Sequence, residues 1–180
     1  MNKRFFVAGL HVDYRRENIT LQALIITKNF LFVDVYRTWE NLDFDAMIKN
    51  VNSCRILKQL KRIYYDKYAL SSIICKKLDD RFMPIAMDNS KRCDMVETVK
   101  FWDTVISCGT SSLFLKQCRF LHKCKNSQGE VISYPLSDIF TGNAEAFSLA
   151  VYGSRNIITK HAKKLKQVKL QSNKNKLNSK

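Results

Sequence analysis

The order in which β-like and helix-like segments follow one another is the feature of this sequence that most constrains its fold. Three runs rich in β-branched and aromatic residues come first, over Phe5 to Val12, Ile19 to Thr27 and Phe30 to Arg37. Only Lys28 and Asn29 separate the second run from the third, a spacing typical of an antiparallel hairpin. The chain is therefore predicted to open with three consecutive strands, the first of which is followed by Asp13.

Helical periodicity begins at Asp43 and then alternates with short strand-like runs. Apolar spacing predicts helices from Asp43 to about Leu60, from about Ala69 to Leu78, from an Asp94 and Glu97 capping signal to about Gly109, and from Thr141 to about Tyr152. Further strands are predicted at Ile63–Tyr65 and Pro84–Met87, with a polar hairpin at Leu113–Lys123 and Glu130–Tyr134. This order predicts an α/β fold with a mixed sheet and helices on both faces, as in ribonuclease H-like folds.

Length and charge indicate one domain with a basic tail. The 180 residues, 46% of them hydrophobic, are expected to form a single domain over 1–155, followed by a tail over 156–180. Residues 160–180 hold eight lysines and no acidic residue, which leaves +7 of the formal charge of +15 on the preceding residues. Such a charge favours a nucleic-acid partner, although a general bias toward lysine and asparagine is an alternative explanation.

The sequence disfavours a protein built around a structural zinc ion and a secreted or membrane-spanning protein. The six cysteines form no CxxC pair, so they are expected to be reduced thiols rather than ligands of a structural zinc ion. The sequence shows no signal peptide and no run of about 18 apolar residues, which is the length that a membrane span needs. A cytoplasmic protein without a membrane partner is therefore expected.

Two acidic residues stand at the ends of predicted strands. Asp13 follows the first strand, and Asp66 lies between the strand Ile63–Tyr65 and the next helix. Carboxylates at neighbouring strand ends can hold a divalent metal ion together. Aspartate is also favoured in turns and at helix starts, which is the alternative for both residues. His11, two residues before Asp13, is expected to be a structural histidine rather than a general base.

The segments Tyr65–Leu70 and Ile74–Leu78 resemble the nuclease domain of tailed-phage terminase large subunits, in which a tyrosine–aspartate element ends a strand. Pro84–Lys91, the hairpin around Asn126 and the small-residue helix Gly142–Ala150 are similar to later elements of that family, so the resemblance covers most of residues 5 to 153. The resemblance implies that Asp13 and Asp66 are the first and second catalytic acids. The GxxxxGK[ST] motif of the terminase ATPase domain is absent, which implies the nuclease part alone.

The third carboxylate of that family lies at the start of the closing helix, where this sequence has Asn143. An asparagine binds a hard divalent cation more weakly than an aspartate does. Glu145 and Asp138 are the alternatives for this third ligand position, and Gly142–Asn143 is also an ordinary helix start. A site with only two acids is expected to bind metal poorly.

The resemblance implies metal-dependent endonucleolytic cleavage of double-stranded DNA during phage genome packaging. Such cleavage uses two divalent ions held by carboxylates, here expected to be Mg²⁺ or Mn²⁺. The implied partners are double-stranded DNA and a separate terminase ATPase subunit or portal, in the cytoplasm of a bacterial host. Two alternatives stay open: a non-catalytic DNA-binding remnant of such a domain, and another ribonuclease H-like nuclease such as a junction resolvase.

Five basic residues near the predicted strand exits are candidates for contacts to DNA phosphates: Arg15, Arg16, Lys67, Lys91 and Arg92. Phosphate contacts give affinity without reading the base sequence. The alternative is that these side chains form an ordinary solvated surface. The sequence shows no recognition-helix signature, so base-specific readout is not expected.

Overall fold

The fold centres on one mixed five-stranded sheet, seen in a computed structural model that describes residues 4–26, 31–105, 124–125, 127–133 and 142–157. Its strands are β1 (Phe5–Asp13), β2 (Asn18–Ile26), β3 (Leu31–Glu40), β4 (Arg62–Asp66) and β5 (Phe82–Ile85), in the spatial order β3-β2-β1-β4-β5. The first three strands pair antiparallel, whereas β4 pairs parallel with both β1 and β5. The predicted mixed sheet is therefore confirmed.

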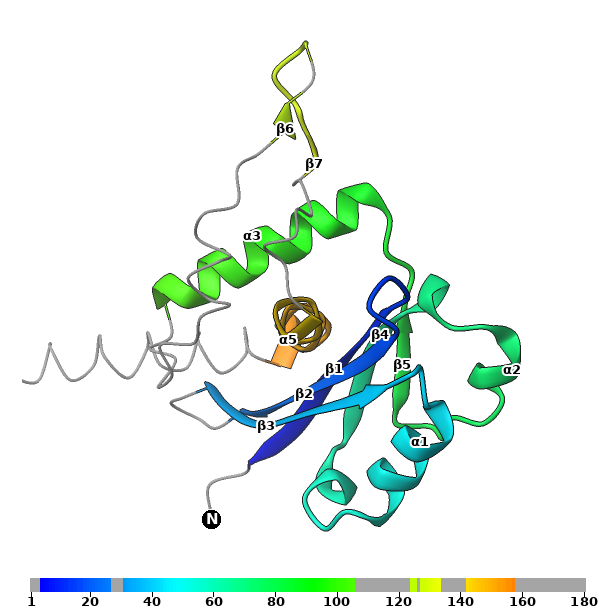
Figure 1. The fold of residues 1–180 in the computed structure, drawn as a ribbon. Helices are drawn as coiled ribbons and strands as arrows, with labels where there is room; N and C mark the ends of the chain where they lie inside the picture. The colour runs from blue at the N-terminus through cyan, green and yellow to red at the C-terminus, as the bar shows by residue number, and fades with distance from the viewer. Residues whose placement is uncertain (1–3, 27–30, 106–123, 126, 134–141, 158–180) are drawn as a thin grey trace, which may run out of the picture.

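Helices cover both faces of this sheet, as predicted (Figure 1). On one face lie α1 (Phe44–Ser53), a 3₁₀ turn over Leu57–Gln59 and the short α2 (Ser72–Cys75). On the other face α5 (Gly142–Gly153) is sandwiched between the sheet and α3 (Asn89–Val105). A two-stranded hairpin of β6 (Cys124–Lys125) and β7 (Val131–Ser133) lies beyond α3.

Period-two alternation along the central strands divides the core between the two faces. In β1, Ala8, Leu10 and Val12 pack into the cluster under α1, while Val7 belongs to the cluster under α5. In β4, Ile63 and Tyr65 face α1 and Tyr64 faces α5. Because successive side chains point to opposite faces of a sheet, the odd-numbered residues of β1 and the even-numbered residues of β4 lie on the α5 face.

Helix α5 is buried on all sides, which explains its small and apolar composition. Every residue from Ala144 to Tyr152 is buried, including Glu145. The helix approaches β1 so closely that a Cβ on Gly9 would lie 1.7 Å from the backbone oxygen of Ala146. Only a glycine permits this approach, which sets Glu145, the residue before Ala146, over the central strands.

Two predicted helices are shorter than the periodicity indicated. The helix predicted from Asp43 to Leu60 ends at Ser53, because the next residue, Cys54, has an extended conformation. Its last turn contains Asn50, whose side chain bonds to the backbone oxygen of Ala46, and asparagine competes with the backbone in this way. The helix predicted from Ala69 to Leu78 is reduced to the four residues of α2.

The predicted start of the third helix was wrong. Helix α3 begins at Asn89, not at Asp94, because Asp88 provides the cap. The Asp88 carboxylate accepts a hydrogen bond from the amide of Lys91 at 2.8 Å, and the backbone oxygen of Asp88 accepts one from the amide of Arg92 at 2.9 Å. This earlier start places Lys91 and Arg92 in the first turn of the helix rather than in a loop.

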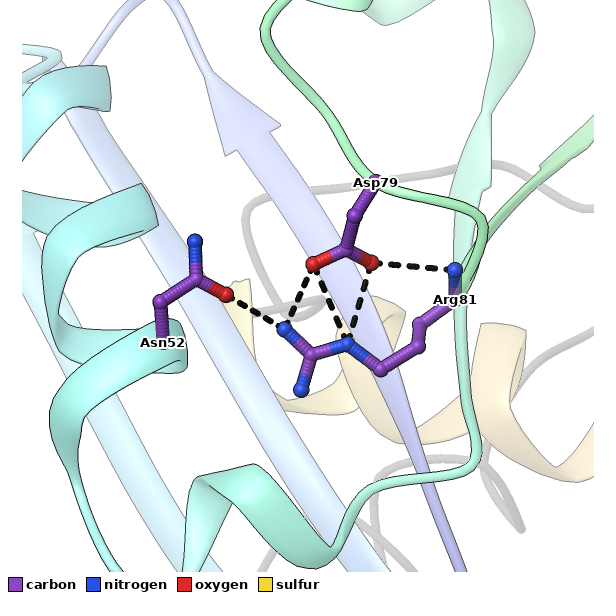
Figure 2. Close-up of polar contacts among 3 residues, drawn as sticks. All are labelled: Asn52, Asp79 and Arg81. Atoms are coloured by element: carbon purple, nitrogen blue, oxygen red, sulfur yellow. Dashed lines mark hydrogen bonds and ion pairs between the residues drawn. The ribbon is translucent and has the colours of Figure 1, made fainter.

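A polar cluster of Asn52, Asp79 and Arg81 lies at the amino-terminal ends of strands β4 and β5 (Figure 2). The Arg81 guanidinium donates to both carboxylate oxygens of Asp79 and to the side-chain oxygen of Asn52 in α1. The hydrogen bond from Arg81 holds the pKa of Asp79 below its ordinary value. Since Ile63 donates its amide to the backbone oxygen of Arg81, the cluster ties α1 to the start of both strands, away from Asp66.

Parts of the earlier predictions fall outside the described residues. The hairpin is confirmed only for β6 and β7, because most of the run Leu113–Lys123 is not described. The basic tail is described only as far as Ile157, so the boundary between domain and tail stays a prediction. No helix in the described part of the chain is long and apolar enough to cross a membrane.

Candidate active site

Asp13 and Asp66 leave the sheet side by side at the carboxyl ends of two parallel central strands. Leu10 of β1 lies opposite Tyr65 of β4, so His11 is level with Asp66 and Asp13 lies two residues further along. By the alternation of faces, all three of these side chains lie on the α5 side of the sheet. The strand register therefore places both acids at the same end of two neighbouring strands, and their role as a pair of metal ligands stays a prediction.

Each of these aspartates uses one carboxylate oxygen to hold the turn that follows it. Asp13 Oδ1 accepts hydrogen bonds from the amides of Arg15 and Arg16 at 3.0 and 3.1 Å. Asp66 Oδ1 accepts a hydrogen bond from the amide of Tyr68 at 3.0 Å. The turn-holding role that the sequence left open is therefore real for both residues, and it engages only one oxygen of each.

The two turns are also joined to one another. The Tyr14 hydroxyl, directly after Asp13, donates a hydrogen bond of 2.6 Å to the backbone oxygen of Ala69, three residues after Asp66. This contact links segments 55 residues apart in sequence. It fixes the position of the Asp13 turn relative to the Asp66 turn at the edge of the sheet.

Glu145 reaches the same edge from α5 and is joined to Asp66 by Arg92 of α3. Arg92 Nη1 lies 2.8 Å from Glu145 Oε1, and Arg92 Nη2 lies 2.9 Å from Asp66 Oδ2. The three side chains are largely covered, with 28% of Arg92, 15% of Asp66 and 7% of Glu145 exposed. One guanidinium therefore bridges two carboxylates that come from different layers of the fold.

The Arg92 bridge offsets the repulsion between the carboxylates of Asp66 and Glu145. Two carboxylates brought together out of water repel one another, and neither is stable there without a positive partner. The planar fork of an arginine offers a separate donor to each acid, and such charge-assisted hydrogen bonds are stronger than neutral ones. Arg92 is thus the counter-ion of the Asp66–Glu145 pair.

The pKa of His11 depends on its burial and on the charges of the nearby acids and of Arg92. Burial is the largest influence on its pKa and lowers it below the ordinary value for histidine. The charges of Glu145, Asp13 and Asp66 act in the opposite direction, and that of Arg92 adds to the lowering. The lowered pKa favours the neutral imidazole, and the structural role expected from the sequence stays a prediction.

The acids have the chemistry of a divalent-cation site but not, in this arrangement, its geometry. Carboxylate oxygens are the ligands that Mg²⁺ and Mn²⁺ prefer. Within the described residues, however, no group of three or more histidine, cysteine or acidic side chains is placed to hold a metal ion. Arg92 takes up the oxygens with which Asp66 and Glu145 face one another, so the cluster as it stands does not fit a metal ion.

The remaining predicted site residues fall into two groups. Of the three candidates for the third acid, Glu145 is the one that the structure brings to Asp66. Asp138 lies outside the described residues, and so does the side chain of Asn143, whose backbone belongs to α5. Assigning Asp13, Asp66, Glu145, Asp138 or Asn143 as ligands stays a prediction.

The candidate phosphate-binding residues lie around the same edge. Arg15, Arg16 and Lys67 are exposed on the two turns, and Arg16 Nε is 3.9 Å from Asp13 Oδ2. Lys91 binds the backbone oxygen of Ala86 and the Asp88 carboxylate. Arg92, by contrast, faces the acids. This role was missed from the sequence, because the third helix was predicted to start at Asp94, which left Arg92 before the helix.

No protein-family model and no curated protein sequence matches this chain. Solved structures do match it. The large terminase nuclease of thermophilic phage G20c with bound magnesium superposes with a TM-score of 0.59 and 9% identity, over 83% of this chain and 81% of that one. For the large terminase nuclease domain of bacteriophage SPP1 with bound manganese the TM-score is 0.55 at 13% identity, over 84% and 86% of the two chains.

The large terminase nuclease domain of Thermus phage P74-26 gives a TM-score of 0.60 at 7% identity, over 82% of this chain and 78% of that one. Sequence identity this low carries information about the fold alone. The ribonuclease H-like arrangement expected from the order of segments is confirmed. The chain has the fold of the nuclease domains of phage large terminases.

Proposed function

We propose that this protein is a metal-dependent endonuclease that cleaves double-stranded DNA in phage genome packaging. The observation that carries the proposal is the meeting of Asp66 and Glu145, through Arg92, at the edge of the sheet where Asp13 also emerges. Carboxylates gathered at one end of a sheet can hold the divalent ions that assist phosphodiester hydrolysis, and in this protein that requires Arg92 to leave Asp66 and Glu145. The candidate ions are Mg²⁺ and Mn²⁺, which the G20c and SPP1 nuclease structures contain.

The charge of the protein supports DNA as the substrate. The formal net charge is +15, and Arg15, Arg16 and Lys67 are exposed beside the acids. Cations placed around a catalytic edge attract the phosphate backbone without selecting a sequence. In this proposal the partners are double-stranded DNA and a separate terminase ATPase subunit or portal, in the cytoplasm of an infected bacterium.

The test is cleavage of supercoiled plasmid in the presence of Mn²⁺ or Mg²⁺. The wild-type protein is expected to nick the plasmid, and Asp66→Asn is expected to nick it at least about 100-fold more slowly, since loss of a group essential to catalysis costs that much or more. Asp45→Asn is the matched control, because Asp45 is an exposed acid of α1, on the opposite face of the sheet. Absence of nicking by the wild type, or equal nicking by Asp66→Asn, would contradict the proposal.

A second candidate function is non-catalytic DNA binding by a domain of this fold. The observation that favours it is the bridge from Arg92 to Asp66 and Glu145, which leaves these acids paired with a cation of the protein itself. Salt-sensitive binding to plasmid DNA without nicking in either metal ion would support this function. A preference for cutting cruciform over plain duplex DNA would instead indicate a junction resolvase.

A further inference from the structure

The Arg92 bridge has a consequence for the way in which a cation can enter the cluster. Asp66 Oδ2 and Glu145 Oε1, the oxygens that face one another, both bind the guanidinium of Arg92 at 2.8–2.9 Å. The other oxygen of Asp66 is held by the amide of Tyr68. A divalent ion that bridged these two facing oxygens would have to occupy the position of the guanidinium.

The two cations also repel one another. A guanidinium and a divalent ion within about 4 Å, in a site shielded from water, interact far more strongly than they would in bulk solvent. The bridging side chains are at most 28% exposed, so solvent screens this repulsion poorly. The positive charge of an arginine side chain is permanent at ordinary pH, so loss of a proton offers no relief of this repulsion.

We propose that Arg92 is an exchangeable counter-ion of the acid cluster and sets its affinity for divalent cations. In the cation-free protein it holds Asp66 and Glu145 together, and a cation binds to this pair only as the Arg92 side chain leaves it. This inference rests on the proposed metal-dependent function, since it assumes that Asp66 and Glu145 act together as ligands.

The neighbouring residues make such an exchange feasible. Arg92 lies in the first turn of α3, which is fixed independently by the cap that Asp88 provides to the amide of Lys91. The backbone of Arg92 can therefore stay in place while its long side chain rotates. Once released, the guanidinium would remain beside the exposed Arg15, Arg16 and Lys67, where a DNA phosphate could receive it.

The experiment compares Mn²⁺ affinity, measured by isothermal titration calorimetry, in the full-length wild type and in Arg92→Gln. The variant is expected to bind Mn²⁺ at least about tenfold more tightly, because the competing cation has been removed. Lys91→Gln is the matched control: it removes one positive charge from the adjacent residue, whose ion pair is with Asp88. Equal or weaker Mn²⁺ binding by Arg92→Gln than by the wild type overturns the inference.

A second measurement avoids dependence on the stability of the variant. In the wild-type protein the guanidinium NMR signals of Arg92 are followed during titration with Mg²⁺. They are expected to shift in step with cation binding, and signals that stay unchanged at saturation overturn the inference. Neither readout uses activity, so the outcomes separate: a wild type that binds Mn²⁺ and nicks DNA, without displacement of Arg92, leaves the proposed function standing.

Discussion

At the level of single residues, the candidate site is made of side chains that each serve two purposes. Asp13 and Asp66 each hold the turn that follows them with one oxygen, and the other oxygen of Asp66 binds Arg92. Arg92 is at once a helix residue, a counter-ion and the obstacle to a cation. Substitutions here are therefore expected to change local order, cation binding and stability by different amounts, which allows these roles to be separated.

The Tyr14 hydroxyl offers a test of how the turns after Asp13 and Asp66 are held together. We expect Tyr14→Phe to lower the free energy of unfolding by about 0.5–1.5 kcal/mol, because the hydrogen bond to the backbone oxygen of Ala69 is lost. Faster amide hydrogen exchange over residues 67–70 should accompany this change. Tyr68→Phe is the control, since that side chain is 72% exposed. Unchanged exchange in Tyr14→Phe would show that this contact does not fix the turns.

Substitution of Glu145 tests how far its ion pair with Arg92 stabilises the protein and whether it binds a cation. Glu145→Gln keeps the shape of the side chain but leaves Arg92 with one acid, so we expect reduced thermal stability together with weakened Mn²⁺ binding. Thermal melting followed by circular dichroism, with and without Mn²⁺, measures both effects. If Glu145→Gln binds Mn²⁺ as tightly as the wild type, Glu145 is not a ligand.

At the level of elements, the site depends on the close contact between α5 and β1. Gly9→Ala would place a methyl group 1.7 Å from the backbone oxygen of Ala146, which has no rotamer with which to avoid it. We expect a loss of stability at or above the upper end of the roughly 1–3 kcal/mol that overpacking costs. Urea denaturation measures it. A loss below that range would mean that α5 can shift away from the sheet without penalty.

The start of α3 gives a matched pair of variants. Asp88→Ala removes the observed cap and should lower the melting temperature more than Asp94→Ala, which changes the residue that the sequence pattern had indicated. Equal effects of the two substitutions would contradict the assignment of Asp88 as the cap.

The same pair predicts a dependence on pH. The hydrogen bond from the amide of Lys91 holds the pKa of Asp88 below its ordinary value. An acid with a lowered pKa contributes stability that is present above the pKa of the unfolded chain, about 3.9, and is lost as the pH falls through the pKa of the folded state. The difference in melting temperature between wild type and Asp88→Ala should therefore be full at pH 7 and shrink as the pH falls below about 4.

At the level of the whole molecule, the net positive charge is divided between residues 160–180 and the rest of the chain. Eight of the lysines lie in residues 160–180, and the preceding residues carry a formal charge of +7. Removal of residues 158–180 should weaken DNA binding and flatten its dependence on salt, because each phosphate contact contributes about 0.9 to the slope of log affinity against log salt. A full-length variant with these eight lysines changed to glutamine is the control, and an unchanged slope in both proteins would contradict a role of the tail.

Much of this architecture could be predicted from the sequence because it depends on local patterns. Runs rich in β-branched and aromatic residues predicted the first three strands of the sheet, and the two-residue spacing at Lys28–Asn29 predicted the hairpin of β2 and β3. Asp13 and Asp66 could be identified because a residue at the end of a strand is located by counting along that strand. Helix ends were less accurate, since a single capping hydrogen bond, such as the one from the amide of Lys91 to Asp88, decides where a helix begins.

The sequence by itself determined which acids stand at the strand ends and that the protein is strongly basic, because both are properties of residues near one another in the chain or of their sum. Only the tertiary structure decided that Glu145 joins Asp66 and that Arg92 lies between them. These two contacts span 53 and 26 residues, and they exist because Gly9 lets α5 approach the sheet while Asp88 starts α3 early enough to aim Arg92 at the acids. The packing of helices against the sheet brings these residues together, and the periodicity of a single segment does not predict it.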